Sequence, residues 1–121
     1  MVKFKNVTKR FGSVQALEKI SFEVEKGEFV FITGPSGAGK TTILKLILGE
    51  NLPDSGEVEG DGINIANVAE KDIPFFRQKI GTVFQDFKVL PERTVAENIE
   101  VALAVIGLGQ SEWDVRVKHV L

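Results

Sequence analysis

A glycine-rich stretch between two apolar segments constrains this chain more than any other feature. Residues 34–41 have the sequence Gly-Pro-Ser-Gly-Ala-Gly-Lys-Thr, which matches the phosphate-binding P-loop pattern. The continuous apolar run Phe29–Thr33 precedes it and is typical of a strand buried on both faces of a parallel sheet. The apolar segment Thr42–Leu48 follows and indicates a helix that Gly49 can end. The order of strand, glycine loop and helix therefore predicts an α/β fold.

The residue types in this loop fit a phosphate ligand. Glycines let successive backbone N–H groups curl around a phosphate without Cβ clashes, and a helix that begins near Lys40 directs its positive end at the same group. The Lys40 ammonium would reach the β- and γ-oxygens, and the Thr41 hydroxyl would bind Mg²⁺. A glycine-rich turn with an incidental lysine is the alternative, but it does not require a strand before it and a helix after it.

The remaining segments predict further strands and helices. Alternating apolar residues indicate strands at Val2–Val7 and Glu18–Glu25, and an apolar run indicates another buried strand at Ile80–Phe84. A capping box at Thr94 and Glu97 predicts a helix to about Ile106. Shorter elements are expected as a strand at 57–59 that pairs with 63–65, a helix at 72–79, a loop at 85–93 and a helix from 111 onward.

Composition excludes several kinds of site. The 121 residues carry 15 Lys+Arg and 17 Asp+Glu, so no excess of positive charge singles out nucleic acid as a partner. The absence of cysteine excludes a disulfide scaffold and a cysteine nucleophile, and a single histidine excludes a multi-histidine metal centre. No apolar run approaches the ~20 residues of a membrane span, and the N-terminus lacks a signal peptide, so a cytoplasmic location is expected.

The whole chain resembles the ATPase subunits of ABC transporters. Residues 34–42 resemble their Walker A loop, Asp54-Ser55-Gly56 resembles the turn before a short strand, and residues 80–85 resemble the strand that ends at the Q-loop glutamine, Gln85. The resemblance implies the ABC ATPase core of the P-loop NTPase class, with an antiparallel β subdomain. It also implies ATP and Mg²⁺ as ligands and ATP hydrolysis as the activity of the complete domain.

Within this family the sequence is most similar to the FtsE-type ATPases of bacterial cell division. Residues 83–91 and 93–99 carry this similarity. It implies an FtsX-like membrane partner, a peripheral location on the inner face of the cell membrane and a homodimer that sandwiches the nucleotide. The alternatives are the ATPases of lipoprotein-release or macrolide-type exporters and a nucleotide-binding fragment that does not hydrolyse ATP. A small P-loop kinase fits less well, because Phe11 and Gln85 would have no counterpart there.

The resemblance assigns roles to individual residues. Lys40 and Gln85 would be catalytic, and Thr41 and Gln85 would bind Mg²⁺. Phe11 would stack on adenine, where the family more often has tyrosine. The nucleotide-binding residues would be Phe11, Gly34, Pro35, Ser36, Gly37, Ala38, Gly39, Lys40, Thr41 and Thr42.

Several family motifs have no match in residues 1–121. These are the Leu-Ser-Gly-Gly-Gln signature, the Walker B strand, the catalytic Glu and the switch His. We therefore expect residues 1–121 to form the N-terminal part of one ABC ATPase domain, with Walker A at 34–41 and the Q-loop from 85, and to show no turnover alone. The family's strand order would leave the strands at 29–33 and 80–84 with unpaired edges. The apolar stretch Val101–Ile106 fits either core packing or contact with a partner.

Overall fold

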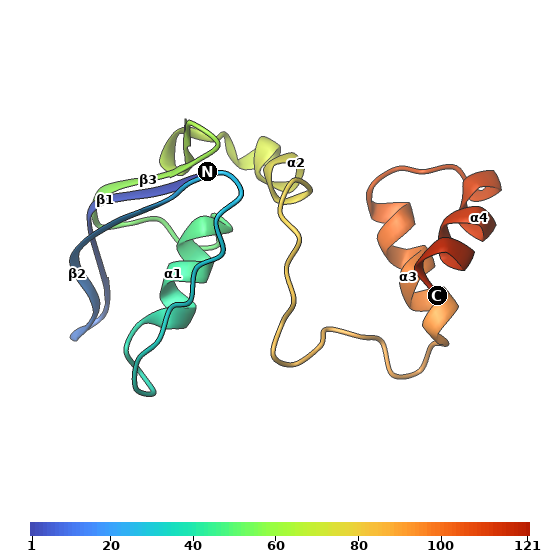
Figure 1. The fold of residues 1–121 in the computed structure, drawn as a ribbon, viewed down its shortest axis with the longest axis horizontal. Helices are drawn as coiled ribbons and strands as arrows, with labels where there is room; N and C mark the ends of the chain where they lie inside the picture. The colour runs from blue at the N-terminus through green and yellow to red at the C-terminus, as the bar shows by residue number, and fades with distance from the viewer. The chain divides into compact units, whose positions relative to one another are not determined.

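The computed structural model describes residues 1–121 as two compact units, Met1–Ile80 and Gly81–Leu121 (Figure 1). The first unit contains a four-stranded antiparallel sheet in the order β2-β1-β3-β4. Its strands are β1 (Val2–Phe11), β2 (Val14–Val24), β3 (Ser55–Gly60) and β4 (Ile63–Asn64). The predicted alternating strands are confirmed, and both are longer than expected because a tight turn at Gly12 and Ser13 joins them into one hairpin.

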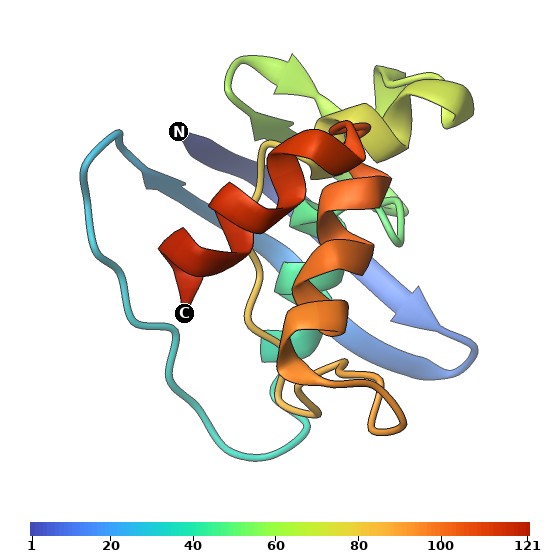
Figure 2. The same cartoon turned by 90° about the vertical axis from the view of Figure 1, so that its right-hand side faces the viewer.

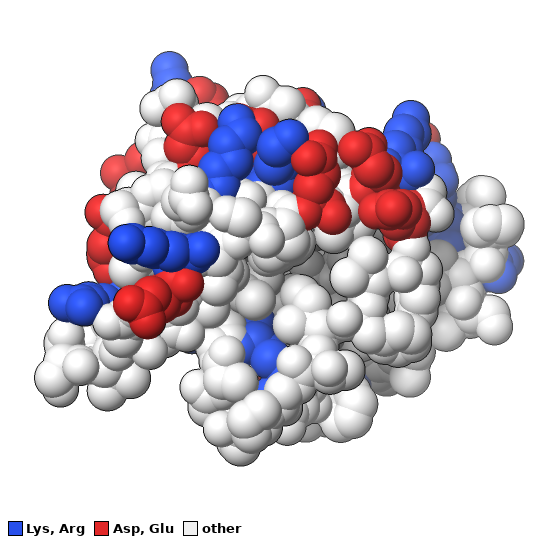
Figure 3. Space-filling view, turned by 60° about the vertical axis from the view of Figure 1, so that its left-hand side comes forward, with Lys and Arg blue, Asp and Glu red and all other residues white.

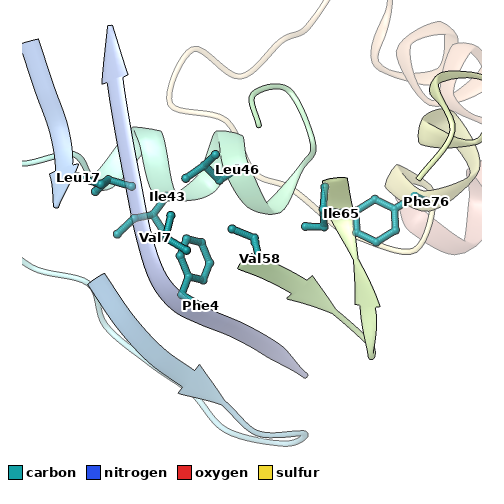
Figure 4. Packing of buried hydrophobic residues seen from close by; sticks show 8 residues of the cluster. All are labelled: Phe4, Val7, Leu17, Ile43, Leu46, Val58, Ile65 and Phe76. Carbon is teal, nitrogen blue, oxygen red and sulfur yellow. The ribbon is translucent and has the colours of Figure 1, made fainter. Parts of the chain in front are cut away.

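Helix α1 (Lys40–Ile47) supplies the other side of the core of this unit. Its Ile43 and Leu46 pack with apolar side chains of the sheet and the following turns, as Figure 4 shows. Burying each such side chain contributes roughly 1.5–3 kcal/mol, so this layer dominates the stability of the unit. The cluster consists of Phe4, Val7, Leu17, Ile43, Leu46, Val58, Ile65 and Phe76.

Short elements close the first unit and contact the end of α1. They are the 3₁₀ turns η1 (Ile65–Asn67) and η2 (Glu70–Asp72) and helix α2 (Ile73–Arg77), which confirms the expected helix with shorter bounds. The Arg77 guanidinium donates hydrogen bonds to the carbonyl oxygens of Leu48, at 2.8 Å, and Gly49, at 3.3 Å. A cation at this position stabilises the negative end of α1.

The second unit is a loop followed by the helices α3 (Val95–Val105) and α4 (Gln110–Val120), seen in Figure 2. The predicted capping box is confirmed: the Thr94 hydroxyl accepts from the Glu97 N–H, and the Glu97 carboxylate accepts from the Thr94 N–H at 2.7 Å. Leu103 of α3 and Val117 of α4 are buried. At the end of α3, however, Val105 is 71% exposed, so the apolar stretch from Val101 is covered only in part.

The two buried strands expected at 29–33 and 80–84 are not formed, and this part of the prediction is wrong. No strand is present in either segment, and Phe29, Phe31 and Val83 are 83%, 78% and 97% exposed. In Figure 2 the connection between β2 and α1 runs as an open loop. A strand buried on both faces needs hydrogen-bonded neighbours, but the sheet pairs only β2 with β1, β1 with β3 and β3 with β4, and neither segment joins it.

Acidic and basic side chains lie next to one another in the upper part of the view in Figure 3, and much of the remaining surface there is uncharged. On β1, Lys3 pairs with Glu23 at 2.6 Å and Lys5 pairs with Glu59 at 2.7 Å. The hydrogen bond that Lys5 donates to the Glu59 carboxylate raises the pKa of Lys5. This mixture produces no extended field of one sign. None of the helices has the length and apolar character needed to cross a membrane.

Candidate functional site

The glycine-rich loop ends at Lys40, whose side chain folds back over the loop. The Lys40 ammonium donates to the carbonyl oxygens of Gly34, at 2.8 Å, and Pro35, at 2.6 Å. The loop also contains a turn closed by the Ala38 N–H and the Pro35 carbonyl at 3.2 Å. The structure therefore brings together the first and last parts of the predicted P-loop, and it holds a cation at the start of α1.

Gly39 fixes where this loop lies against the sheet. Its φ is 85°, a left-handed conformation that side chains rarely adopt. A Cβ atom there would lie 2.4 Å from the carbonyl oxygen of Ala16 and 2.7 Å from Cδ2 of Leu17, both on β2. Only glycine allows the loop to approach β2 this closely, so the sheet determines the position of the first turn of α1.

The N-terminus of α1 is open to an anion. The first N–H groups of any α-helix have no partner within the helix, and α1 has neither a side-chain cap nor an acidic residue in its first turn to bind them. These groups carry the positive end of the helix dipole. Thr41 is exposed beside Lys40, whereas Thr42 is only 9% exposed and packs inward. Of the two hydroxyl groups, Thr41 is therefore the one that a metal ion could reach.

Phe11 lies at the end of β1, opposite Val14, and is 46% exposed. The Lys9 ammonium lies over its ring, 5.5 Å from the centroid, and pairs with the Asp54 carboxylate at 3.0 Å. The same carboxylate accepts from the Arg10 N–H at 2.6 Å. This backbone hydrogen bond, followed by the one from Lys9, lowers the pKa of Asp54.

A role for Phe11 was predicted from the sequence, but the contacts of Lys9 with its ring and of Asp54 with Lys9 were not. Residues i and i+2 of a strand share a face, so the spacing of Lys9 and Phe11 could have indicated the contact between these two side chains. The contact with Asp54 crosses 45 positions of the chain and depends on the pairing of β1 with β3. Nothing in the local pattern around Asp54 indicates it.

Gln85 lies in the second unit and is exposed. It belongs to a turn in which the Phe87 N–H donates to the Phe84 carbonyl at 3.2 Å. The neighbouring Asp86 pairs with Lys88 at 2.6 Å, and this hydrogen bond lowers the pKa of Asp86. The segment expected to be a loop at 85–93 is therefore confirmed as one, with Gln85 accessible near its start.

The family model described as ABC transporter matches residues 17–121. The chain belongs to the ABC transporter family. This confirms the resemblance to the ABC ATPases that the sequence indicated. The match includes α1 and both helices of the second unit.

Two relatives whose names state a role align with the whole length of this chain. The cell division ATP-binding protein FtsE of Bacillus subtilis is 48% identical, and the chain covers 54% of its length. The lipoprotein-releasing system ATP-binding protein LolD of Bacteroides thetaiotaomicron is 43% identical, and 56% of it is covered. The chain thus spans about half the length of these relatives.

A solved structure of similar fold confirms the predicted fold class. It is the dimeric post-hydrolysis state of the ATP-binding cassette MJ0796 bound to ADP and Pi. That chain is 37% identical, with a TM-score of 0.84; the match covers 98% of the present chain and 55% of MJ0796. The α/β core with an antiparallel β part is therefore that of an ABC ATPase cassette.

Proposed function

We propose that residues 34–42 bind the phosphates of ATP and that the whole protein is an FtsE-type ABC ATPase. The observation that carries the proposal is the position of Lys40 at the open N-terminus of α1, where its ammonium reaches back to Gly34 and Pro35. A triphosphate would take the ammonium and the first N–H groups of α1 as donors. The loop glycines would leave room for its oxygens.

Other residues would complete the nucleotide site. Phe11 would stack on adenine, because its ring is partly exposed at the end of β1. The exposed Thr41 hydroxyl would bind Mg²⁺, which prefers oxygen ligands. The family resemblance assigns the exposed Gln85 amide to the same ion. When bound, Mg²⁺ neutralises charge on the β- and γ-phosphates. Gln85 would also orient the attacking water.

The choice of partner rests on the relatives. The 48% identity to FtsE supports a role in bacterial cell division with an FtsX-like membrane subunit, at the inner face of the membrane. The 43% identity to LolD favours lipoprotein release as the second candidate. The dimeric state of MJ0796 supports a homodimer around the nucleotide. An FtsX-like gene beside the gene for this protein, and co-purification of the two products, would favour the first role.

The phosphate assignment is tested by Lys40→Ala in the whole protein. We expect hydrolysis to be abolished and ATP binding, measured by calorimetry, to be strongly weakened, because Lys40 supplies the cation of the loop. Lys45→Ala is the matched control, since Lys45 is an exposed lysine in the last turn of the same helix. Hydrolysis at the parental rate in Lys40→Ala would show that the P-loop assignment is wrong.

We also propose that residues 1–121 form the first part of one ABC ATPase domain and do not turn over ATP alone. Nothing in them matches the family's catalytic Glu or signature loop, and hydrolysis needs a group that activates the attacking water. Phosphate release by this polypeptide with ATP and Mg²⁺, lost in its Lys40→Ala variant, would contradict the proposal.

A further inference from the structure

A chain of polar contacts links the turn before β3 to the ring of Phe11. The Asp54 carboxylate accepts from the Arg10 N–H at 2.6 Å and from the Lys9 ammonium at 3.0 Å. Lys9 in turn lies 5.5 Å from the centre of the Phe11 ring. A lysine at this distance over an aromatic face is held there by the ring quadrupole. Asp54 therefore binds the two residues that directly precede Phe11, Lys9 and Arg10, and reaches the ring only through Lys9.

The turn that carries Asp54 is itself fixed on β1. The Asp54 N–H donates to the Thr8 carbonyl at 2.9 Å. Two residues later, Gly56 has a φ of 82°, and a Cβ there would lie 2.4 Å from the Asn6 carbonyl oxygen. The turn thus cannot move away from β1 without breaking backbone hydrogen bonds of the sheet. A carboxylate anchored in this way is suited to hold a neighbouring side chain in one orientation.

We propose that Asp54 is a positioning residue for adenine: through Lys9 and the Arg10 N–H it fixes the Phe11 ring in the orientation that stacks on the base. The Lys9 side chain is only 14% exposed, whereas Phe11 is 46% exposed, so the cation occupies a sheltered place beside a ring that remains accessible. A ring held before binding loses less side-chain freedom when the base arrives. This inference rests on the proposed stacking role of Phe11.

The proposal predicts a loss that is specific for the base. In the whole protein, Asp54→Ala should weaken ATP binding by about threefold to tenfold, the range expected for the loss of one preorganised side chain. Binding of inorganic tripolyphosphate, which has no base, should not weaken. Asp54→Asn keeps an acceptor for the Arg10 N–H but loses the charge that holds Lys9, so its loss for ATP should be smaller.

A double-mutant cycle with Phe11→Ala separates positioning from general support of the fold. Once the ring is absent, Asp54→Ala should cause no further loss of ATP affinity. Asp61→Ala is the matched control, because Asp61 also lies in an exposed turn and forms an ion pair, with the amino group of Met1 at the opposite end of β1. It should leave both affinities unchanged.

Calorimetry with ATP and with tripolyphosphate gives each outcome a meaning. The positioning role would be overturned if both Asp54 variants lost affinity for ATP and for tripolyphosphate in parallel, or if both kept the parental affinities. Additive losses of ATP affinity in the double-mutant cycle would overturn it as well. If Phe11→Ala itself leaves ATP affinity unchanged, the stacking role of Phe11 fails and the inference fails with it. A base-specific loss that disappears without the ring supports it.

Discussion

Gly39→Ala tests whether contact with β2 sets the position of the phosphate loop. The added Cβ would lie 2.4 Å from the Ala16 carbonyl oxygen, about 1 Å short of ordinary van der Waals contact. Because the obstacle is backbone of a paired strand, the loop has to move instead. The left-handed φ of 85° adds a conformational penalty of roughly 1–2 kcal/mol for any residue with a Cβ.

The structure provides a matched control for the conformational part of this cost. Gly37 has a similar φ of 79°, but a Cβ there would meet nothing within 4 Å. Gly37→Ala should therefore lower the free energy of unfolding by ~1–2 kcal/mol. Gly39→Ala carries an added overpacking cost of ~1–3 kcal/mol and should lower it by ~2–5 kcal/mol in total.

Urea unfolding without nucleotide, followed by circular dichroism, measures this difference. Changes in the midpoint at constant slope would report the stability of each variant. Equal losses for Gly39→Ala and Gly37→Ala would refute the reasoning, because they would mean that contact with Ala16 and Leu17 does not constrain the loop. A larger loss for Gly37→Ala would refute it as well.

Three further predictions concern the base, the Q-loop and a helix cap. Phe11→Ala should weaken ATP binding about tenfold, within the ~1–3 kcal/mol of a lost stack, and Phe11→Tyr should be nearly neutral in the same calorimetric titration. Gln85→Ala should lower kcat more than ATP affinity in steady-state and binding assays, because its amide would act on the attacking water; a large affinity loss with normal kcat would contradict this. The hydrogen bonds that the backbone N–H and the hydroxyl of Thr94 donate to Glu97 lower the pKa of that carboxyl. The cap therefore stabilises α3 fully at a pH above the ordinary carboxyl pKa, and this stabilisation is lost as the pH falls through the lowered pKa. The amide exchange rates of α3 in the wild type and in Glu97→Gln should therefore become equal in acid. A difference between the two proteins that stays constant at all pH values would count against this role of the Glu97 carboxylate.

Signals that act over a few residues were sufficient to predict much of this molecule. The capping box joins Thr94 to a residue three positions later. The apolar segment after the glycine-rich loop forms helix α1, as predicted. The alternation of apolar and polar residues predicted each strand of the β1–β2 hairpin, although not their pairing across the two-residue turn. The signal that was sufficient in each case lies within one short segment of the chain.

The errors and omissions involve partners that are distant in the chain. The apolar run Phe29–Thr33 has the composition of a buried strand, but composition does not supply the neighbouring strands that such a segment requires. The same holds for Ile80–Phe84. The contact between Lys9 and Asp54 was missed for a related reason, because it depends on the register of β1 and β3.

The contrast between contacts that are close in the chain and contacts that are distant in it leads to a last prediction. It concerns how binding of the phosphates and binding of the base depend on the fold. The proposed phosphate donors lie within residues 34–42, and the close approach of Gly39 to β2 and the packing of α1 on the sheet hold them in place. The setting of the Phe11 ring instead requires β1, β2 and the turn before β3 in their correct register. Disturbing the β1–β3 pairing should therefore reduce the preference for ATP over tripolyphosphate before it reduces phosphate binding itself. Gly39→Ala, which disturbs the approach of the loop to β2, should by contrast weaken binding of ATP and of tripolyphosphate equally, because both ligands need the start of α1 in place.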